Sequence, residues 1–135
     1  YTTKVAVDCL RREGESTLER GMYLQLLRLE QVADRDAKRA GLEAMLERCP
    51  EFPAAWLMLA GLLEDPEAKG RAIERGLAHD PDAETRGQLL LNKASLLALT
   101  GSESEGVEIL SRLEEDEAST VQTRALARIY LTSFE

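Results

Sequence analysis

The chain has 135 residues, a formal net charge of −8 and a hydrophobic content of 44%. The negative charge disfavours nucleic acid and anionic membranes as partners, and no apolar run approaches the roughly eighteen residues that a membrane-spanning helix needs. Cys9 and Cys49 lack metal-ligand spacing, so we expect mostly buried thiols, no metal and a cytoplasmic location, while the start at Tyr1 leaves a removed leader or anchor open.

The composition favours an all-α fold in a single domain over residues 1–135. Only 4% of the residues are aromatic, Ala and Leu are abundant, and the four prolines fall outside the predicted helix interiors. The first predicted helix covers residues 3–12. It is either the end of an upstream helix or a cap on the first repeated unit.

A helical hairpin is predicted over residues 16–50. Ser16 and Glu19 have the spacing of a capping box at the start of its first helix. Asp34 can cap the second helix, and Pro50 ends it. Each helix of the pair has one apolar side, so the two can pack against each other.

Residues 51–81 form the clearest hairpin. Its first helix carries an apolar stripe at i, i+3, i+4 and i+7, whose small third member lets another helix approach closely. Asp65 and Pro66 supply an N-cap and a first-turn proline for the second helix, which ends before Pro81. The two facing stripes are Trp56, Leu59, Ala60 and Leu63, and Ala72, Ile73, Gly76 and Leu77. Two such helices cannot bury both faces alone, so neighbouring copies are expected.

A third hairpin is predicted over residues 82–117. Gly101 stands where a left-handed C-terminal cap belongs, and Ser102 with Glu105 has capping-box spacing for the next helix. The acidic run over 114–117 is poorly placed at a helix C-terminus, where the helix dipole favours cations. We therefore expect a turn there.

A last helix is predicted over residues 119–134 as the first helix of a further unit. Its packed stripe is expected to be Leu126, Ala127 and Tyr130. The other apolar side offers a surface through which two copies of the chain could associate. That surface consists of Leu126, Ile129, Leu131 and Phe134.

The hairpins repeat with a regular spacing. Trp56, Ala60 and Leu63 recur 34 residues later as Leu90, Ala94 and Leu97, and the second helices align Ile73 and Gly76 with Leu110 and Leu113. This helix-turn-helix period, with its large, small and aliphatic positions, resembles the tetratricopeptide repeat. Lys69 departs from the pattern, because the family prefers alanine at that place.

The resemblance implies an α-α superhelix of antiparallel hairpins, with about three repeats plus terminal helices. The repeats would pack through a shared core. That core is expected to comprise Trp56, Leu59, Ala60, Leu63, Ile73, Gly76, Pro81, Leu90, Ala94, Leu97 and Leu110.

The resemblance also implies a concave groove, lined by the first helix of each pair, that holds a peptide or protein partner. The groove residues would be Tyr23, Leu27, Leu57, Met58, Gly61, Leu91, Asn92, Ser95, Arg124 and Arg128. Some family members clamp a partner's C-terminal carboxylate with lysine and asparagine. Here those places hold Tyr23, Leu27, Met58, Gln88 and Asn92, which implies that this clamp is absent.

For any single groove residue, a packing role is the favoured interpretation. Leu57 and Leu91 would then lie under neighbouring helices, and Arg124 and Arg128 would solvate a terminal helix. The hypothesis for function is a hydrophobic anchor near Leu57 and Leu91 with an acidic partner group near the two arginines.

Catalysis finds little support in the sequence. His79, the one histidine, precedes Asp80 and Pro81 at a helix end, where a cation caps favourably. Cys49 has no sequence-evident base beside it, and no phosphate loop or dinucleotide motif is present. We therefore expect a non-enzymatic interaction scaffold without cofactors. A regulatory or ligand-sensing domain of a larger protein, or a self-associating structural repeat, are the alternatives.

Overall fold

The computed structural model describes residues 21–134, and these residues form seven α-helices and no strand. The all-α prediction is therefore confirmed. The predicted helix over 3–12 and the capping box of Ser16 and Glu19 lie outside the described residues. The helices are α2 (Met22–Glu30), α3 (Arg35–Arg48), α4 (Pro53–Leu62), α5 (Pro66–Ala78), α6 (Ala83–Leu99), α7 (Glu103–Glu115) and α8 (Val121–Thr132).

Side-chain caps and prolines begin several of these helices where the sequence predicts. The Asp34 carboxylate accepts hydrogen bonds from the backbone N–H groups of Asp36 and Ala37, at 3.0 and 3.3 Å. The Asp65 carboxylate accepts from the N–H of Ala68 at 2.9 Å, and Pro66 occupies the first turn of α5. These contacts satisfy N–H groups that have no partner within the helix.

The turn between α6 and α7 corrects one predicted cap. Gly101 has the expected left-handed conformation, with φ 92°, and the Ser102 N–H donates to the Leu97 carbonyl oxygen at 2.8 Å. The Ser102 side chain makes no capping hydrogen bond, so the capping box with Glu105 is wrong. The backbone of Ser102 serves the end of α6, with ψ 47° in place of the extended ψ of an N-cap residue.

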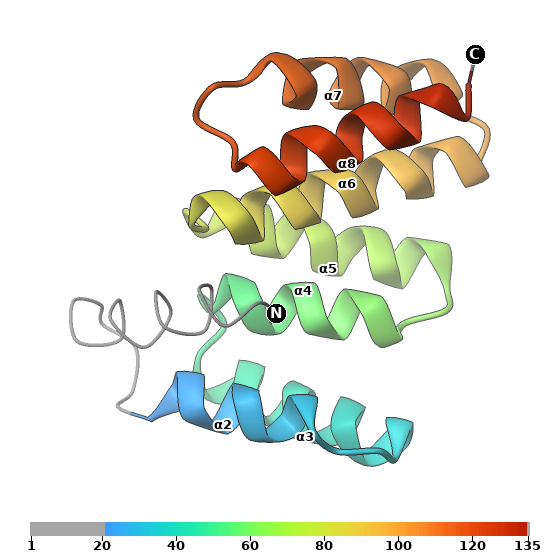
Figure 1. Ribbon diagram of the computed structural model, residues 1–135. Helices are drawn as coiled ribbons and strands as arrows, with labels where there is room; N and C mark the ends of the chain where they lie inside the picture. Colours follow the sequence, from blue (N-terminus) through green and yellow to red (C-terminus); the bar gives the residue numbers. More distant parts are fainter. Residues whose placement is uncertain (1–20, 135) are drawn as a thin grey trace.

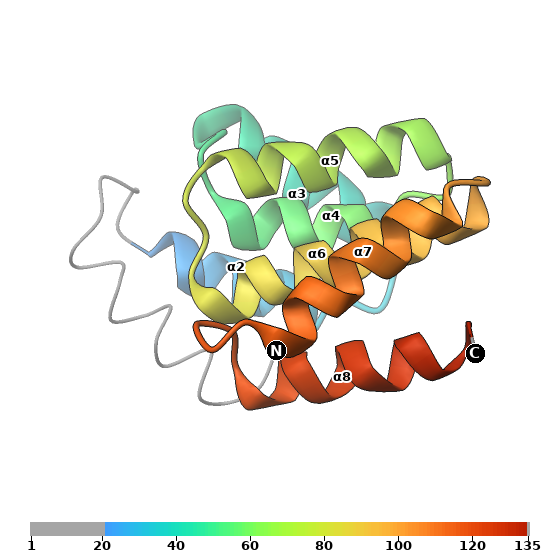
Figure 2. The same cartoon turned by 90° about the horizontal axis from the view of Figure 1, so that it is seen from above.

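The helices form a stack that begins at α2 and α3 and ends at α7 and α8 (Figure 1). Each helix packs against the next one along the chain, and α6 also packs against α4 and α8. Figure 2, viewed from above, shows α5 and α8 on opposite sides of α6. Within the described range, no helix is both long and apolar enough to cross a membrane.

Two clusters of buried residues hold the stack together, and they meet at α6. The first extends from α2 to the near side of α6 and includes Phe52 and Leu89, both fully buried. The second joins α6 to α8 and includes Leu91 and Leu110. Because Leu89 and Leu91 lie on one helix, α6 couples the two halves of the stack.

Most of the predicted core is buried. The buried members are Leu59, Ala60, Leu63, Ile73, Gly76, Ala94 and Leu110, whereas Trp56, Pro81, Leu90 and Leu97 are half-buried. Trp56 lies at the edge of the first cluster, where its indole N–H donates to the Pro50 carbonyl oxygen at 2.7 Å. The Arg75 guanidinium lies 5.3 Å from the centre of the ring, so one part of the indole meets polar groups.

The packed side of α8 differs from the prediction. Thr123 and Ala127 are buried, Leu126 is half-buried, and Tyr130 is 36% exposed. Thr123 packs directly on Gly87 of α6, which has no side chain to keep it away. Its hydroxyl oxygen lies 3.0 Å from that of Thr120, so this buried polar group is hydrogen-bonded. The hydrophobic pattern of the sequence does not predict that Thr123 is buried, because its side chain is polar.

The acidic run forms the predicted turn after α7, and Asp116 organises it. Its carboxylate accepts from the Ala118 N–H at 2.9 Å, from the Ser119 hydroxyl at 3.1 Å and from Arg86 of α6 at 3.3 Å. These hydrogen bonds, first that of Ala118 and then that of Arg86, lower the pKa of Asp116 below its usual value of 3.8.

Asp116→Asn should therefore destabilise the protein in a pH-dependent way. Because the folded-state pKa lies below the unfolded one, the contribution of the carboxylate is fully present above about pH 4 and is lost as the pH falls through the folded-state value. The difference in urea midpoint between wild type and variant should shrink on acidification. Glu117→Gln, at an exposed neighbour, is the control. A difference that stays constant with pH would contradict this role of Asp116.

Candidate binding groove

One stripe of α6 lies open between its two neighbouring helices. Gln88, Asn92, Ser95 and Leu99 are spaced at i, i+4, i+7 and i+11, which places them on one side of the helix. Asn92, Ser95 and Leu99 are exposed. Since α4 flanks this stripe on one side and α8 on the other, the stripe forms the floor of a groove.

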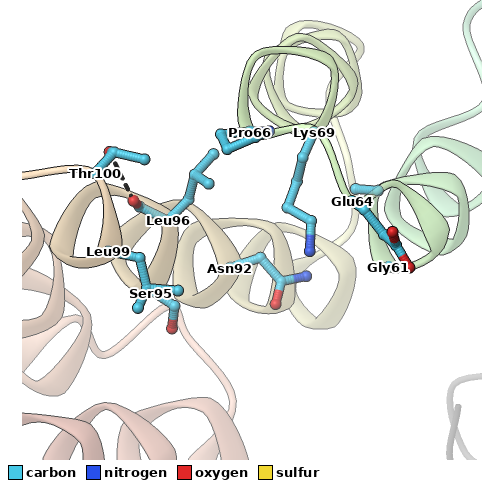
Figure 3. A pocket seen from close by; sticks show the side chains of 10 residues that line it. Gly61, Glu64, Pro66, Lys69, Asn92, Ser95, Leu96, Leu99 and Thr100 are labelled. Carbon is cyan, nitrogen blue, oxygen red and sulfur yellow. Dashed lines mark hydrogen bonds between the residues drawn. The ribbon is translucent and has the colours of Figure 1, made fainter.

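The first hollow in this groove, which we name the Lys69 pocket, lies between α4, α5 and α6 (Figure 3). Its volume is about 240 Å³. Its lining includes Gly61, Glu64, Lys69, Asn92, Ser95 and Leu99. A Cβ atom added at Gly61 would meet no other atom within 4 Å, so this position faces open space. Because glycine has no side chain, this wall of the pocket stays open.

Two further hollows lie between α6 and α8. The Gln122 pocket, of about 380 Å³, has a mixed polar and apolar lining that includes Glu84, Gln88, Leu91, Asn92, Gln122 and Tyr130. The Phe134 pocket, of about 300 Å³, is mostly apolar, and its lining includes Ala94, Ser95, Leu110, Ile129, Tyr130 and Phe134. Tyr130 lines both pockets and separates a hollow of mixed lining from an apolar one.

Shared residues join the three pockets into one groove. Asn92 lines both the Lys69 pocket and the Gln122 pocket. Ser95 lines both the Lys69 pocket and the Phe134 pocket. A chain that crosses α6 at these two residues could therefore place side chains on both sides of the helix.

A buried carboxylate secures the polar end of the groove. Glu84 is 8% exposed and accepts hydrogen bonds from Gln88 at 3.0 Å and from the Thr120 hydroxyl at 2.9 Å. The second bond ties the first turn of α6 to the start of α8. Glu84 also lies in the first turn of α6, where the helix dipole stabilises a negative charge. The carboxylate is thus stabilised by the helix end and by its two hydrogen bonds.

The structure brings together three of the ten predicted groove residues on the open surface. Gly61, Asn92 and Ser95 line the Lys69 pocket. Leu27 and Met58 are half-buried, and Met58 packs against the first core cluster.

Tyr23, Leu57 and Leu91 are buried in the core, which corrects their predicted position on an open surface. They are 6%, 6% and 3% exposed. The Tyr23 ring meets Phe52 edge-on, with ring centres 4.7 Å apart. The cause is the double coverage of these helices, because a helix that packs on two neighbours buries more than one stripe. Leu91, although buried, also contributes to the wall of the Gln122 pocket.

The two predicted groove arginines lie beside the end of α7. The Arg124 guanidinium donates to the Glu114 carbonyl oxygen at 3.0 Å, and Arg128 lies 3.7 Å from the Glu114 carboxylate. Neither residue lines the three pockets described here. Their contacts correct the predicted basic end of the groove, because cations at a helix C-terminus stabilise that helix.

Three residues line the groove although the sequence patterns do not predict them as groove residues. They are Lys69, Gln122 and Tyr130. The one feature of the sequence that distinguishes Lys69 is that it departs from the repeat pattern, which prefers alanine at that place. Of the predicted self-association surface, Ile129 is 60% exposed, whereas Leu126, Leu131 and Phe134 are half-buried against the second core cluster.

The reactive side chains outside the groove are held at helix ends. His79 is the C-cap residue of α5 and is exposed, and Cys49 is the C-cap residue of α3 and is 4% exposed. Among residues 21–134, no group of three or more His, Cys, Asp or Glu side chains is placed to hold a metal ion.

No protein-family model matches the chain, and no curated protein or solved structure matches it. The groove itself is therefore the basis on which a function can be proposed. Its open floor, its three connected pockets and the chemistry of their walls are the features that a function must use.

Proposed function

We propose that the chain is a tetratricopeptide-like array of helical hairpins that binds an extended segment of a partner protein in the groove over α6. It works as a scaffold, without enzymatic activity and without a cofactor, and we assign it to the cytoplasm. Its binding surface is rigid because nearest-neighbour helix packing positions every wall of the groove.

The packing of the helices supports the repeat assignment. The first helices of successive hairpins, α4, α6 and α8, pack against one another in chain order, and each also packs against the preceding second helix. This is the arrangement that stacked helical pairs with a 34-residue period require. The net charge of −8 makes a nucleic acid an unfavourable occupant of the groove.

The observation that carries the proposal is the connection of the three pockets through Asn92 and Ser95. A single small-molecule site would be one enclosed hollow, whereas separate open hollows on the two flanks of α6 suit different side chains of an extended chain that crosses this helix. The alternatives of a ligand-sensing domain and of a self-associating repeat stay predictions.

Ser95→Tyr should abolish peptide binding, because the ring would fill the junction of the Lys69 and Phe134 pockets. A library of short random peptides, displayed on phage with both peptide ends joined to linkers, is sorted on the wild-type chain. The affinity of the best synthetic peptide should then fall by about ten-fold or more in the variant.

Ser104→Tyr is the matched control. Ser104 is exposed on α7 and lines none of the three pockets, so this change adds the same ring elsewhere. If the library yields no binding peptide, or if both tyrosine variants bind as the wild type does, the groove is not a peptide site.

A further inference from the structure

The Lys69 pocket contains hydrogen-bond donors that form no bond with any other part of residues 21–134. Lys69 lies in the second turn of α5, and its half-buried side chain extends toward Asn92 of α6 (Figure 3). Within residues 21–134, its ammonium group makes no ion pair or hydrogen bond, and neither does the Asn92 amide. An ammonium and an amide NH2 group together offer several donors on one side of an open hollow.

Two backbone carbonyl oxygens at the ends of the helices beside this pocket have donors of their own. At the end of α4, the Leu62 carbonyl oxygen accepts from Arg35 at 2.7 Å. At the end of α6, the Leu96 carbonyl oxygen accepts from the Thr100 hydroxyl at 2.8 Å. Each of these two oxygens is thus hydrogen-bonded to a group other than Lys69.

The one carboxylate in the lining, that of Glu64, is directed to a different cation. Its oxygen lies 3.9 Å from Arg35, and its side chain is 87% exposed. Among the described residues, Lys69 is therefore a cation that forms no ion pair and lies beside the Asn92 amide, with the exposed Glu64 carboxylate in the same lining. A ligand that supplies a carboxylate would form charge-assisted hydrogen bonds there.

The neighbouring Phe134 pocket is also apolar, but its lining contains no charged side chain, whereas that of the Lys69 pocket contains Lys69 and Glu64. Leu110, Ile129 and Phe134 line it, and it meets the Lys69 pocket at Ser95. Adjacent helices lie about 10 Å apart, and an extended chain in the polyproline II conformation advances about 3.1 Å per residue and returns to the same side after three residues. Side chains that enter pockets on the two flanks of α6 would thus be separated by roughly three residues.

Building on the proposed function, we propose that the Lys69 pocket selects an aspartate or glutamate side chain of the bound segment, and that the Phe134 pocket takes a large apolar side chain roughly three residues away. The carboxylate belongs to an internal residue of the segment. The Lys69 pocket borders the Gln122 pocket at Asn92 and the Phe134 pocket at Ser95, so a chain whose side chain enters it has a further hollow beside it at each of these residues.

The experiment uses the peptides selected on the wild-type chain, which have no free ends during selection. The enriched sequences should carry an acidic residue spaced from a large apolar residue as proposed. For a synthetic peptide of this kind, changing its Glu to Gln should weaken binding about ten-fold, and Lys69→Gln in the protein should do the same. The two losses should not add, since both remove one interaction.

Two protein variants serve as controls. Lys69→Arg keeps the cation and should retain binding within a few-fold. Arg71→Gln removes a charge from an exposed position on the same helix that lines none of the three pockets, and it should leave the affinity unchanged. Circular dichroism of each variant confirms that the helices are intact.

The outcomes separate the two proposals. Enriched peptides without an acidic residue, or equal affinity for wild type and Lys69→Gln, would overturn the carboxylate assignment while the Ser95→Tyr result still supports the groove. A failure to enrich any peptide would instead remove the proposed function itself.

Discussion

Phe52→Ala should lower the free energy of unfolding by about 3–5 kcal/mol. Phe52 is fully buried in the first core cluster and is one of its largest side chains. Its ring meets Tyr23 of α2 at an interplanar angle of 77°, so it joins α2 to the start of α4. Removing the ring leaves a cavity that two neighbouring helices line. Urea denaturation followed by far-ultraviolet circular dichroism measures the loss.

Phe52→Leu is the control for this prediction. Leucine keeps most of the apolar volume, so we expect a loss of less than about 1.5 kcal/mol. If Phe52→Ala also costs less than about 1 kcal/mol, the ring does not support the first core cluster, and the junction of α2 with α4 must have another basis.

Phe52 shows where a hydrophobic pattern stops predicting burial. It stands between two helices, immediately before Pro53, and its extended backbone has φ −108° and ψ 91°. A helical period applies only to residues within a helix, so it gives no position to a residue in the connection. The burial of Phe52 depends on how the connection turns over α2, and that is decided by packing in three dimensions.

The positions of the helices were predictable because their signals are local. Asp34, Asp65, Pro66 and Gly101 act on backbone groups within a few residues of themselves, and each occupies its predicted place in the structure. The predicted side-chain cap at Ser102 is wrong because another helix competes for this residue. Two helices meet at that residue, and its backbone serves the first of them.

The groove was predictable only in part, because a groove residue is defined by the helices around it. Gly61, Asn92 and Ser95 are polar or lack a side chain, and they stay on the surface. Leu57 and Leu91 occupy adjacent turns of the same helices but are buried by neighbouring helices. The surroundings of Lys69 depend on which side chains α4 and α6 place around it, and no spacing in the sequence reports that.

Gly106→Ala should destabilise the protein even though alanine is the better helix former. Gly106 is buried in α7, and a Cβ atom there would lie 2.7 Å from the carbonyl oxygen of Ala94 in α6. A backbone oxygen inside a helix cannot move aside as a side chain can, so α6 and α7 would have to separate. Strain of about 3 kcal/mol outweighs a gain in helix propensity of about 1 kcal/mol. The net loss should appear as a lower urea midpoint.

Gly70→Ala should have the opposite sign, which makes it the matched control. Gly70 lies inside α5, and its Cβ atom would meet only the flexible end of Leu96, at 3.6 Å. Because that is an ordinary contact distance, the substitution should stabilise the protein by about 0.5–1 kcal/mol through helix propensity. Equal effects from both substitutions would show that helix propensity governs Gly106 as well, and that α6 and α7 pack less closely than the structure places them.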